Sequence, residues 1–173
     1  MRGLRISLPS GFTLVEMLIV LAILAILVGV GMPTFSDSMR DRRLGSVTSE
    51  YISAIYIARN ESLTRRQLIT LTPLPAGWQA GWSISDGVNV LHQYVNPDPD
   101  DTEIRFPGAG VSSLRFNANG RVTMNNGTTL ANISLLVCDS RDDERGRTLN
   151  LSAFGAVENV VHEDSTLCNP GDA

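Results

Sequence analysis

Apolar side chains are concentrated near the start of the chain. Between Phe12 and Met32 the sequence reads FTLVEMLIVLAILAILVGVGM, and Glu16 is its one ionisable side chain. As a helix rising about 1.5 Å per residue, this run is roughly 30 Å long, which matches the hydrocarbon core of a bilayer. The sequence therefore predicts a membrane-spanning helix over 12–32, followed by a polar remainder.

Beyond Pro33 the apolar pattern becomes that of an amphipathic helix. Small and apolar residues recur there at spacings of three and four: Leu44, Val47, Tyr51, Ala54, Ile55, Ala58 and Ser62. This period predicts a helix over about 34–66 that lies with one face against a sheet. Pro33 removes a backbone donor just after Gly29 and Gly31, so we expect the helix to bend there.

The rest of the chain predicts β-strands separated by turns. Apolar runs are found at 68–73, 81–85, 88–94, 103–106, 113–117, 122–124, 133–139, 148–151 and 157–161. Turns are expected at Asp86-Gly87, Asn119-Gly120 and Asn126-Gly127. The expected fold class is α+β, with a long N-terminal helix packed on an antiparallel β-sheet head. Trp78 and Trp82 are expected to be packing residues near the start of a strand.

Size and charge narrow the function classes. The chain has 173 residues, and its 14 basic residues, all arginine, stand against 18 acidic ones, for a net charge of -4. Such a length fits a single domain, and the acidic balance argues against a general nucleic-acid binder.

Glu16 is the anomaly in the apolar run. The first eleven residues carry Arg2 and Arg5 and no acid, which fits a cytoplasmic leader, a cleaved signal peptide or a plain membrane anchor. Neither a signal peptide nor an anchor explains a carboxylate there, which costs about 2.5 to 3.5 kcal/mol near the middle of a membrane helix and less near its end. Cleavage between Gly11 and Phe12 would place a new amine one helical turn from Glu16, or within reach of a neighbouring copy's carboxylate.

The stretch GFTLVEMLIVLAILAIL resembles the class III signal of type IV pilins and type II secretion pseudopilins. The resemblance implies that a prepilin peptidase removes 1–11 after Gly11 and methylates the amine of Phe12. It also implies that 12–32 anchors the subunit in the inner membrane and then forms the filament core, with Glu16 acting in assembly and Pro33 at a helix kink.

Four later segments resemble the GspH/FimT group of minor pilins and pseudopilins: YIARNESLTRRQLITL, GWQAGWSISDG, SLRFNANGRV and CDSRDDERGRTLNLSAFGAV. This resemblance implies a periplasmic pilin-like head over 33–173 and a minor pilin that helps to start or cap a type IV pilus. Its partners would be other minor and major pilins or pseudopilins and an inner-membrane assembly platform. The alternative is an H-type pseudopilin of type II secretion.

The chain contains two cysteines, Cys138 and Cys168. In the oxidising periplasm, which the membrane signal implies, an even pair is most simply one disulfide. Closing this loop would stabilise the head by roughly 3.5 kcal/mol in the chain-entropy model. A metal site is disfavoured because His92 and His162 show no ligand spacing with the cysteines.

No catalytic motif is present: the sequence lacks GxSxG, HExxH, a P-loop and CxxC, so we expect neither an enzyme nor a cofactor. The acidic runs 98–101 and 142–144 are expected to be solvated, with calcium binding as the alternative. A further alternative is a DNA-binding minor pilin for DNA uptake, because some FimT-like members bind DNA through arginines near the C-terminus. However, 152–173 contains no arginine or lysine. Arg141, Arg145 and Arg147 lie among acidic residues, so nucleic-acid binding is disfavoured.

Overall fold

The computed structural model describes residues 12–106, 110–125, 132–139, 146–162 and 168. The chain divides into two compact units, Met1–Arg40 and Asp41–Ala173, and each is described by itself. The boundary lies within a single helix, α1 (Leu14–Arg65), so each unit contains part of that helix. The second unit is called the head below.

In the first unit, α1 begins at Leu14 and continues through Pro33. The helix is thus continuous across the proline, and the expected bend there stays a prediction. Among the described residues, no helix is both long enough and apolar enough to cross a membrane. The span expected over 12–32 also stays a prediction.

In the head, α1 buries the face that its sequence period predicts. All seven predicted residues lie at or below 6% exposure, and Ser62 is fully buried. Arg66, at φ 52°, takes up a left-handed backbone conformation directly after the last helical residue, Arg65, which ends the helix. The helix therefore ends one residue before the expected boundary.

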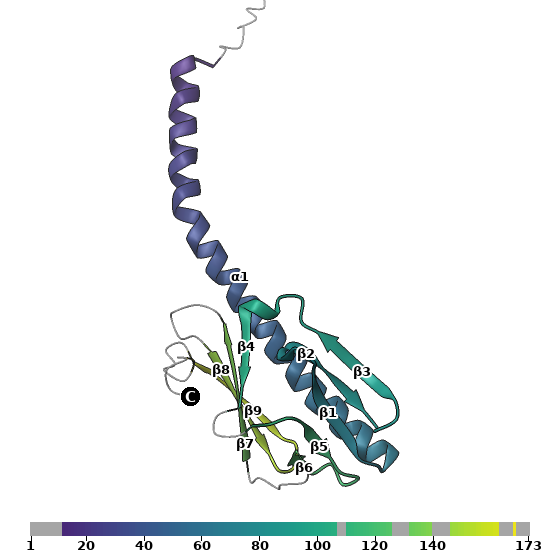
Figure 1. Cartoon of the computed structure of the whole chain (residues 1–173). Coiled ribbons are helices and arrows are strands. Elements are labelled where there is room, and N and C mark those ends of the chain that lie inside the picture. The colour runs from purple at the N-terminus through teal and green to yellow at the C-terminus, as the bar shows by residue number, and fades with distance from the viewer. Residues whose placement is uncertain (1–11, 107–109, 126–131, 140–145, 163–167, 169–173) are drawn as a thin grey trace, which may run out of the picture. The chain divides into compact units, whose positions relative to one another are not determined.

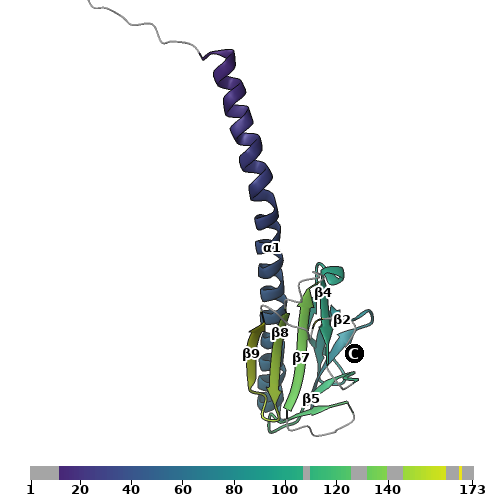
Figure 2. The same ribbon diagram turned by 90° about the vertical axis from the view of Figure 1, so that its left-hand side faces the viewer.

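Nine strands in the described residues form two antiparallel sheets (Figure 1). The strands are β1 (Ile69–Leu74), β2 (Gly77–Ser85), β3 (Val90–Val95), β4 (Thr102–Arg105), β5 (Leu114–Phe116), β6 (Val122–Met124), β7 (Asn132–Asp139), β8 (Gly146–Ser152) and β9 (Val157–His162). The five-stranded sheet has the order β3-β2-β1-β5-β6, and the four-stranded sheet has the order β4-β7-β8-β9. Figure 2 shows the strands of the second sheet beside the head part of α1.

The structure confirms an α+β fold, and every expected strand is found. The sequence predicted one sheet in the head, whereas the described strands form two. β2 begins four residues earlier than the expected start at Gly81, and a 3-10 helix, η1 (Pro99–Asp101), was not expected. Two expected turns are present, with positive φ at Gly87 and Gly120, while Asn126-Gly127 lies outside the described residues.

The core joins α1 to both sheets. Tyr51 of α1 meets Trp82 edge-on with ring centroids 4.9 Å apart, and it meets Trp78 in the same way at 5.8 Å. Trp78 Nε1 donates a hydrogen bond to Val111 O at 2.9 Å, so the buried indole N–H is satisfied. The prediction that both tryptophans pack in the head is confirmed, since they are 7% and 2% exposed.

Candidate assembly segment and head

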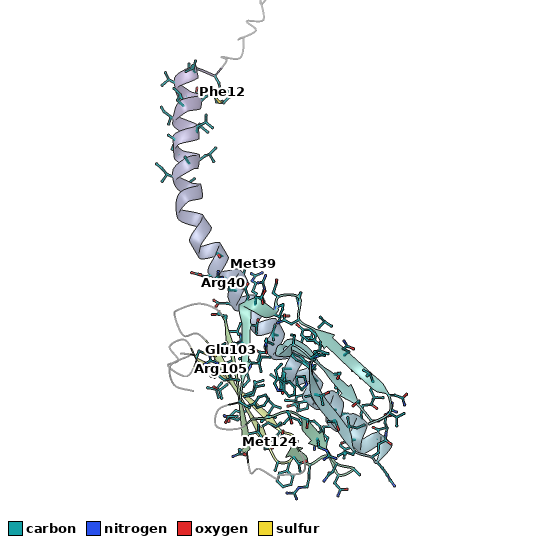
Figure 3. The ribbon with its side chains drawn as sticks, viewed as in Figure 1. Phe12, Met39, Arg40, Glu103, Arg105 and Met124 are labelled. Carbon is teal, nitrogen blue, oxygen red and sulfur yellow. A yellow bond between two sulfur atoms is a disulfide. The ribbon has the colours of Figure 1, made fainter. Side chains whose placement is uncertain are left out.

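The N-terminal apolar segment, 12–27, exposes its large side chains around the whole helix. Twelve large apolar residues there are between 42% and 77% exposed: Phe12, Leu14, Val15, Met17, Leu18, Ile19, Val20, Leu21, Ile23, Leu24, Ile26 and Leu27. Figure 3 shows these side chains projecting from the first turns of α1, where Phe12 is labelled. A helix that is apolar on every side is stable only when something surrounds it. The segment therefore requires a membrane or other protein chains around it.

Glu16 lies in the first turn of α1, where the helix dipole favours a negative charge. Thr13 directly precedes the helix, and its Oγ1 accepts a hydrogen bond from the backbone N–H of Glu16 at 3.2 Å. Thr13 is thus the N-cap, and the spacing Thr-x-x-Glu is that of a capping box. The sequence analysis missed this role of Thr13, although the spacing alone signals it.

The Glu16 carboxylate forms no ion pair within the described residues. The capping arrangement uses the backbone N–H of Glu16 and leaves its charge available. Gly11, the other residue at the expected cleavage site, lies outside the described residues. The charge pair with a free amine at Phe12 therefore stays a prediction.

The two cysteines form the expected disulfide. Cys138 and Cys168 are bonded, with their Cα atoms 5.7 Å apart, and 30 residues separate them in sequence. Cys138 lies on β7 opposite Gly146 of β8. A side chain at Gly146 would collide with Cys168 Sγ, so only glycine fits beneath the bridge. Nothing in the sequence signals this requirement, because it arises from the β7–β8 register.

The acidic run at 98–101 is tied to the helix. Arg43 of α1 forms ion pairs with Asp98 at 2.9 Å and with Asp101 at 2.5 Å. One guanidinium therefore balances the charges of two neighbouring carboxylates. In the part of the chain that the structure describes, no cluster of three or more His, Cys, Asp or Glu side chains could hold a metal ion. The second acidic run, 142–144, lies outside that part.

Two arginines pack inside the head. The guanidinium of Arg147 on β8 lies against Gly45 of α1, and that of Arg59 on α1 lies beside Gly120 and Gly155. The Nε atoms of Arg59 and Arg147 are buried. Arg147 therefore connects the helix to β8, and Arg59 packs against the turns at Gly120 and Gly155. Of the arginines weighed as a DNA patch, Arg141 and Arg145 lie outside the described residues, and Arg147 is half-buried.

Comparison with known families gives two matches. A family model described as "Type II transport protein GspH" matches residues 48–155. A second model, described as "Prokaryotic N-terminal methylation motif", matches residues 8–32. The first match covers most of the head, and the second covers the apolar run 12–32 and the four residues before it.

Among solved structures, the chain is similar to the type IV minor pilin FimU of Pseudomonas aeruginosa, at 21% identity and a TM-score of 0.57. The match covers 72% of this chain and 96% of that one. A second crystal form of FimU gives 22% identity and a TM-score of 0.54, over 70% of this chain and 98% of that one. The minor pseudopilin EpsH of Vibrio cholerae matches at 10% identity and a TM-score of 0.47, over 67% of this chain and 94% of EpsH. Comparison with curated proteins gives no significant match.

Proposed function

Because the chain belongs to the family of type II transport protein GspH, we propose that it is a minor pilin that helps to start or cap a type IV pilus. Members of this family are structural pilins and pseudopilins that assemble with one another rather than enzymes. The observation that carries the proposal is the 12–27 segment, which exposes apolar side chains on all sides and has Glu16 as its one ionisable side chain.

The proposed route to assembly begins with cleavage after Gly11. A prepilin peptidase removes 1–11 and methylates the amine of Phe12, consistent with the methylation motif matched at 8–32. The segment 12–32 then holds the subunit in the inner membrane with the head in the periplasm. An assembly platform moves it into the filament, where Pro33 permits a bend.

In the filament the charge of Glu16 would set the register of neighbouring subunits. A charge buried in an apolar bundle is costly unless it is paired. The Glu16 carboxylate would therefore form an ion pair with the amine of Phe12 in an adjacent chain. Axial sliding by one residue would separate the two charges by about 1.5 Å more and expose each to apolar surroundings. The pair would thus select a single stagger.

The type II secretion pseudopilin is the second candidate, and the description of the matched family favours it. Both machines use the same N-terminal segment, so a genetic experiment separates them. Deletion of the gene should abolish or reduce surface pili and leave secretion of folded exoproteins intact. Loss of secretion with normal piliation would instead establish the pseudopilin.

Mass spectrometry of the chain from sheared filaments tests the assembly role directly. The expected protein lacks 1–11 and carries one methyl group on Phe12. An unprocessed chain in filaments, or its absence from them, would contradict the proposal. A Gly11→Val variant should remain unprocessed in the membrane, while Ser10→Ala, a change beside the cleavage site, should be processed normally.

A further inference from the structure

Strand β3 forms an outer edge of the five-stranded sheet, as Figure 1 shows. Its sequence, VLHQYV, contains neither a charged residue nor proline, and Val90 and Val95 are 62% and 61% exposed. Natural edge strands usually carry charges or proline, which prevent another strand from pairing with them. β3 lacks both protections along its whole length.

The other sheet edges in the described residues are protected. β4 carries Glu103 and Arg105, which form an ion pair and are labelled in Figure 3. β9 carries Glu158, and β6 is only three residues long. β3 is therefore the described edge best suited to accept a further strand.

The register shows which backbone groups of β3 face outward. Asn96 N–H, directly after the strand, donates to Ala80 O of β2 at 3.0 Å. Residues alternate between the two sides of an antiparallel strand, so Gln93 and Val95 direct their N–H and C=O groups away from β2. An added strand would find these groups in place to pair.

A groove of about 130 Å³ runs between β3 and the flank of α1. Its walls include Glu50, Ser53 and Ile57 from α1 and Trp82, His92 and Tyr94 from the sheet. The sheet ends at β3 and leaves this flank of the helix uncovered. One more strand beside β3 would extend the sheet over the groove and direct alternate side chains into it.

The groove has the chemistry of a cation site. Glu50 is exposed and forms no ion pair within the described residues. Tyr94 stacks on Trp82 with ring centroids 4.6 Å apart, which presents aromatic surface beside that carboxylate. Glu50 and Tyr94 line the same groove, and burial together with the charge of Glu50 raises the pKa of Tyr94 above its ordinary value. A carboxylate beside aromatic rings attracts guanidinium and ammonium groups.

We propose that an extended segment of a different filament subunit pairs with β3 and places an arginine or lysine side chain against Glu50 and Tyr94. This inference rests on the proposed role as a filament subunit. A second copy of this chain fits poorly, because β3, β6 and β9 contain no lysine or arginine and Arg105 of β4 is paired with Glu103. Strand addition supplies the backbone bonds, and the basic side chain supplies the selectivity.

The test uses the full chain in its own cells, with a photo-cross-linking amino acid at Val95. We expect a cross-link to another protein that carries the N-terminal methylation motif, within a segment that contains arginine or lysine. Gln93→Pro removes an outward N–H without removing a bond to β2, and Glu50→Lys reverses the groove charge. Each variant should lower the cross-link yield by about fivefold or more, the ratio equivalent to about 1 kcal/mol.

Matched controls are Gln93→Thr, which keeps the N–H, and Glu158→Lys, which makes the same charge change on β9; neither should lower the yield. The proposal is overturned if no cross-link forms or if the cross-link joins a second copy of this chain. It is also overturned if the cross-link yield is unchanged in both Gln93→Pro and Glu50→Lys. Incorporation into sheared filaments is measured in the same cells. Normal incorporation without the cross-link rejects the docking site alone, while absence from filaments rejects the filament role and the docking site together.

Discussion

The two ends of helix α1 differ in apolar content and in what surrounds their apolar side chains. In 12–27 the apolar side chains are exposed on every side, whereas in 41–65 most of them form one stripe that is buried beneath two sheets. The stripe is completed by the chain's own strands, which explains why the head forms a compact unit. Among the described residues, the large apolar side chains of 12–27 remain exposed. The comparison teaches that apolar content shows that a helix must be buried. The distribution of apolar residues around the helix axis then predicts whether the helix is buried by its own chain or by other molecules.

Loss of the disulfide should have the largest effect on the head. The double substitution Cys138→Ser and Cys168→Ser opens a loop of 30 residues and should lower the free energy of unfolding by about 3.5 kcal/mol. Membrane association should be unchanged, because 12–32 does not depend on the bridge. Denaturant titration of the full chain in detergent, followed by tryptophan fluorescence, measures the first effect, and cell fractionation measures the second. Unchanged stability would show that the bridge is dispensable.

The same leucine-to-alanine substitution should have different effects in the head and in the N-terminal segment, and this is the second-largest effect that we expect. Leu71 of β1 is fully buried, and Leu71→Ala should cost about 3 kcal/mol through lost burial and a cavity. Leu21 is 61% exposed, so Leu21→Ala should leave the unfolding of the head unchanged and weaken assembly instead. The same denaturant titration and a filament assay measure the pair. If Leu71→Ala and Leu21→Ala lowered the stability of the head equally, the proposed difference between the two regions would be wrong.

Tyr51→Phe should have the smallest effect at neutral pH. The hydroxyl is buried without a hydrogen-bond partner among the described residues, so its removal should raise the free energy of unfolding by up to about 1 kcal/mol. Burial also raises the pKa of Tyr51 above its ordinary value of 10.0. The unfolded chain therefore loses this proton first, and stability falls as the pH rises above 10.0. In the Tyr51→Phe variant, the part of the fall in stability at alkaline pH that comes from ionisation of Tyr51 should be absent. Denaturant titrations at neutral and alkaline pH measure both effects. A lower stability of the variant at pH 7 would contradict the account.

The sequence predicted what depends on local pattern. Helical period alone identified the buried face of α1, although it missed Thr48, a polar residue that is fully buried. Its hydroxyl donates to Leu44 O at 2.6 Å, which removes the cost of burying it. Composition gives no sign of such local satisfaction.

The sequence could not predict what depends on long-range pairing. Alternating strands look the same in either sheet, so nothing local indicates that β1 pairs with β5 while β4 pairs with β7. The need for glycine at Gly146 has the same origin, because it follows from the position of Cys168 over the β7–β8 pair. At the N-terminus, by contrast, Thr13 was readable from its spacing to Glu16 and was overlooked.

The central claim is that the charge of Glu16 directs assembly of the N-terminal segment. Two variants separate that charge from the helix cap: Glu16→Gln keeps the backbone N–H and the side-chain size, while Thr13→Val removes the capping oxygen and keeps the charge. The direct measurement is the fraction of each full-length chain found in sheared filaments relative to membranes. We predict that Glu16→Gln lowers this fraction about tenfold or more, because a buried amine loses its partner, and that Thr13→Val changes it by less than about threefold. Normal incorporation of Glu16→Gln would contradict the account.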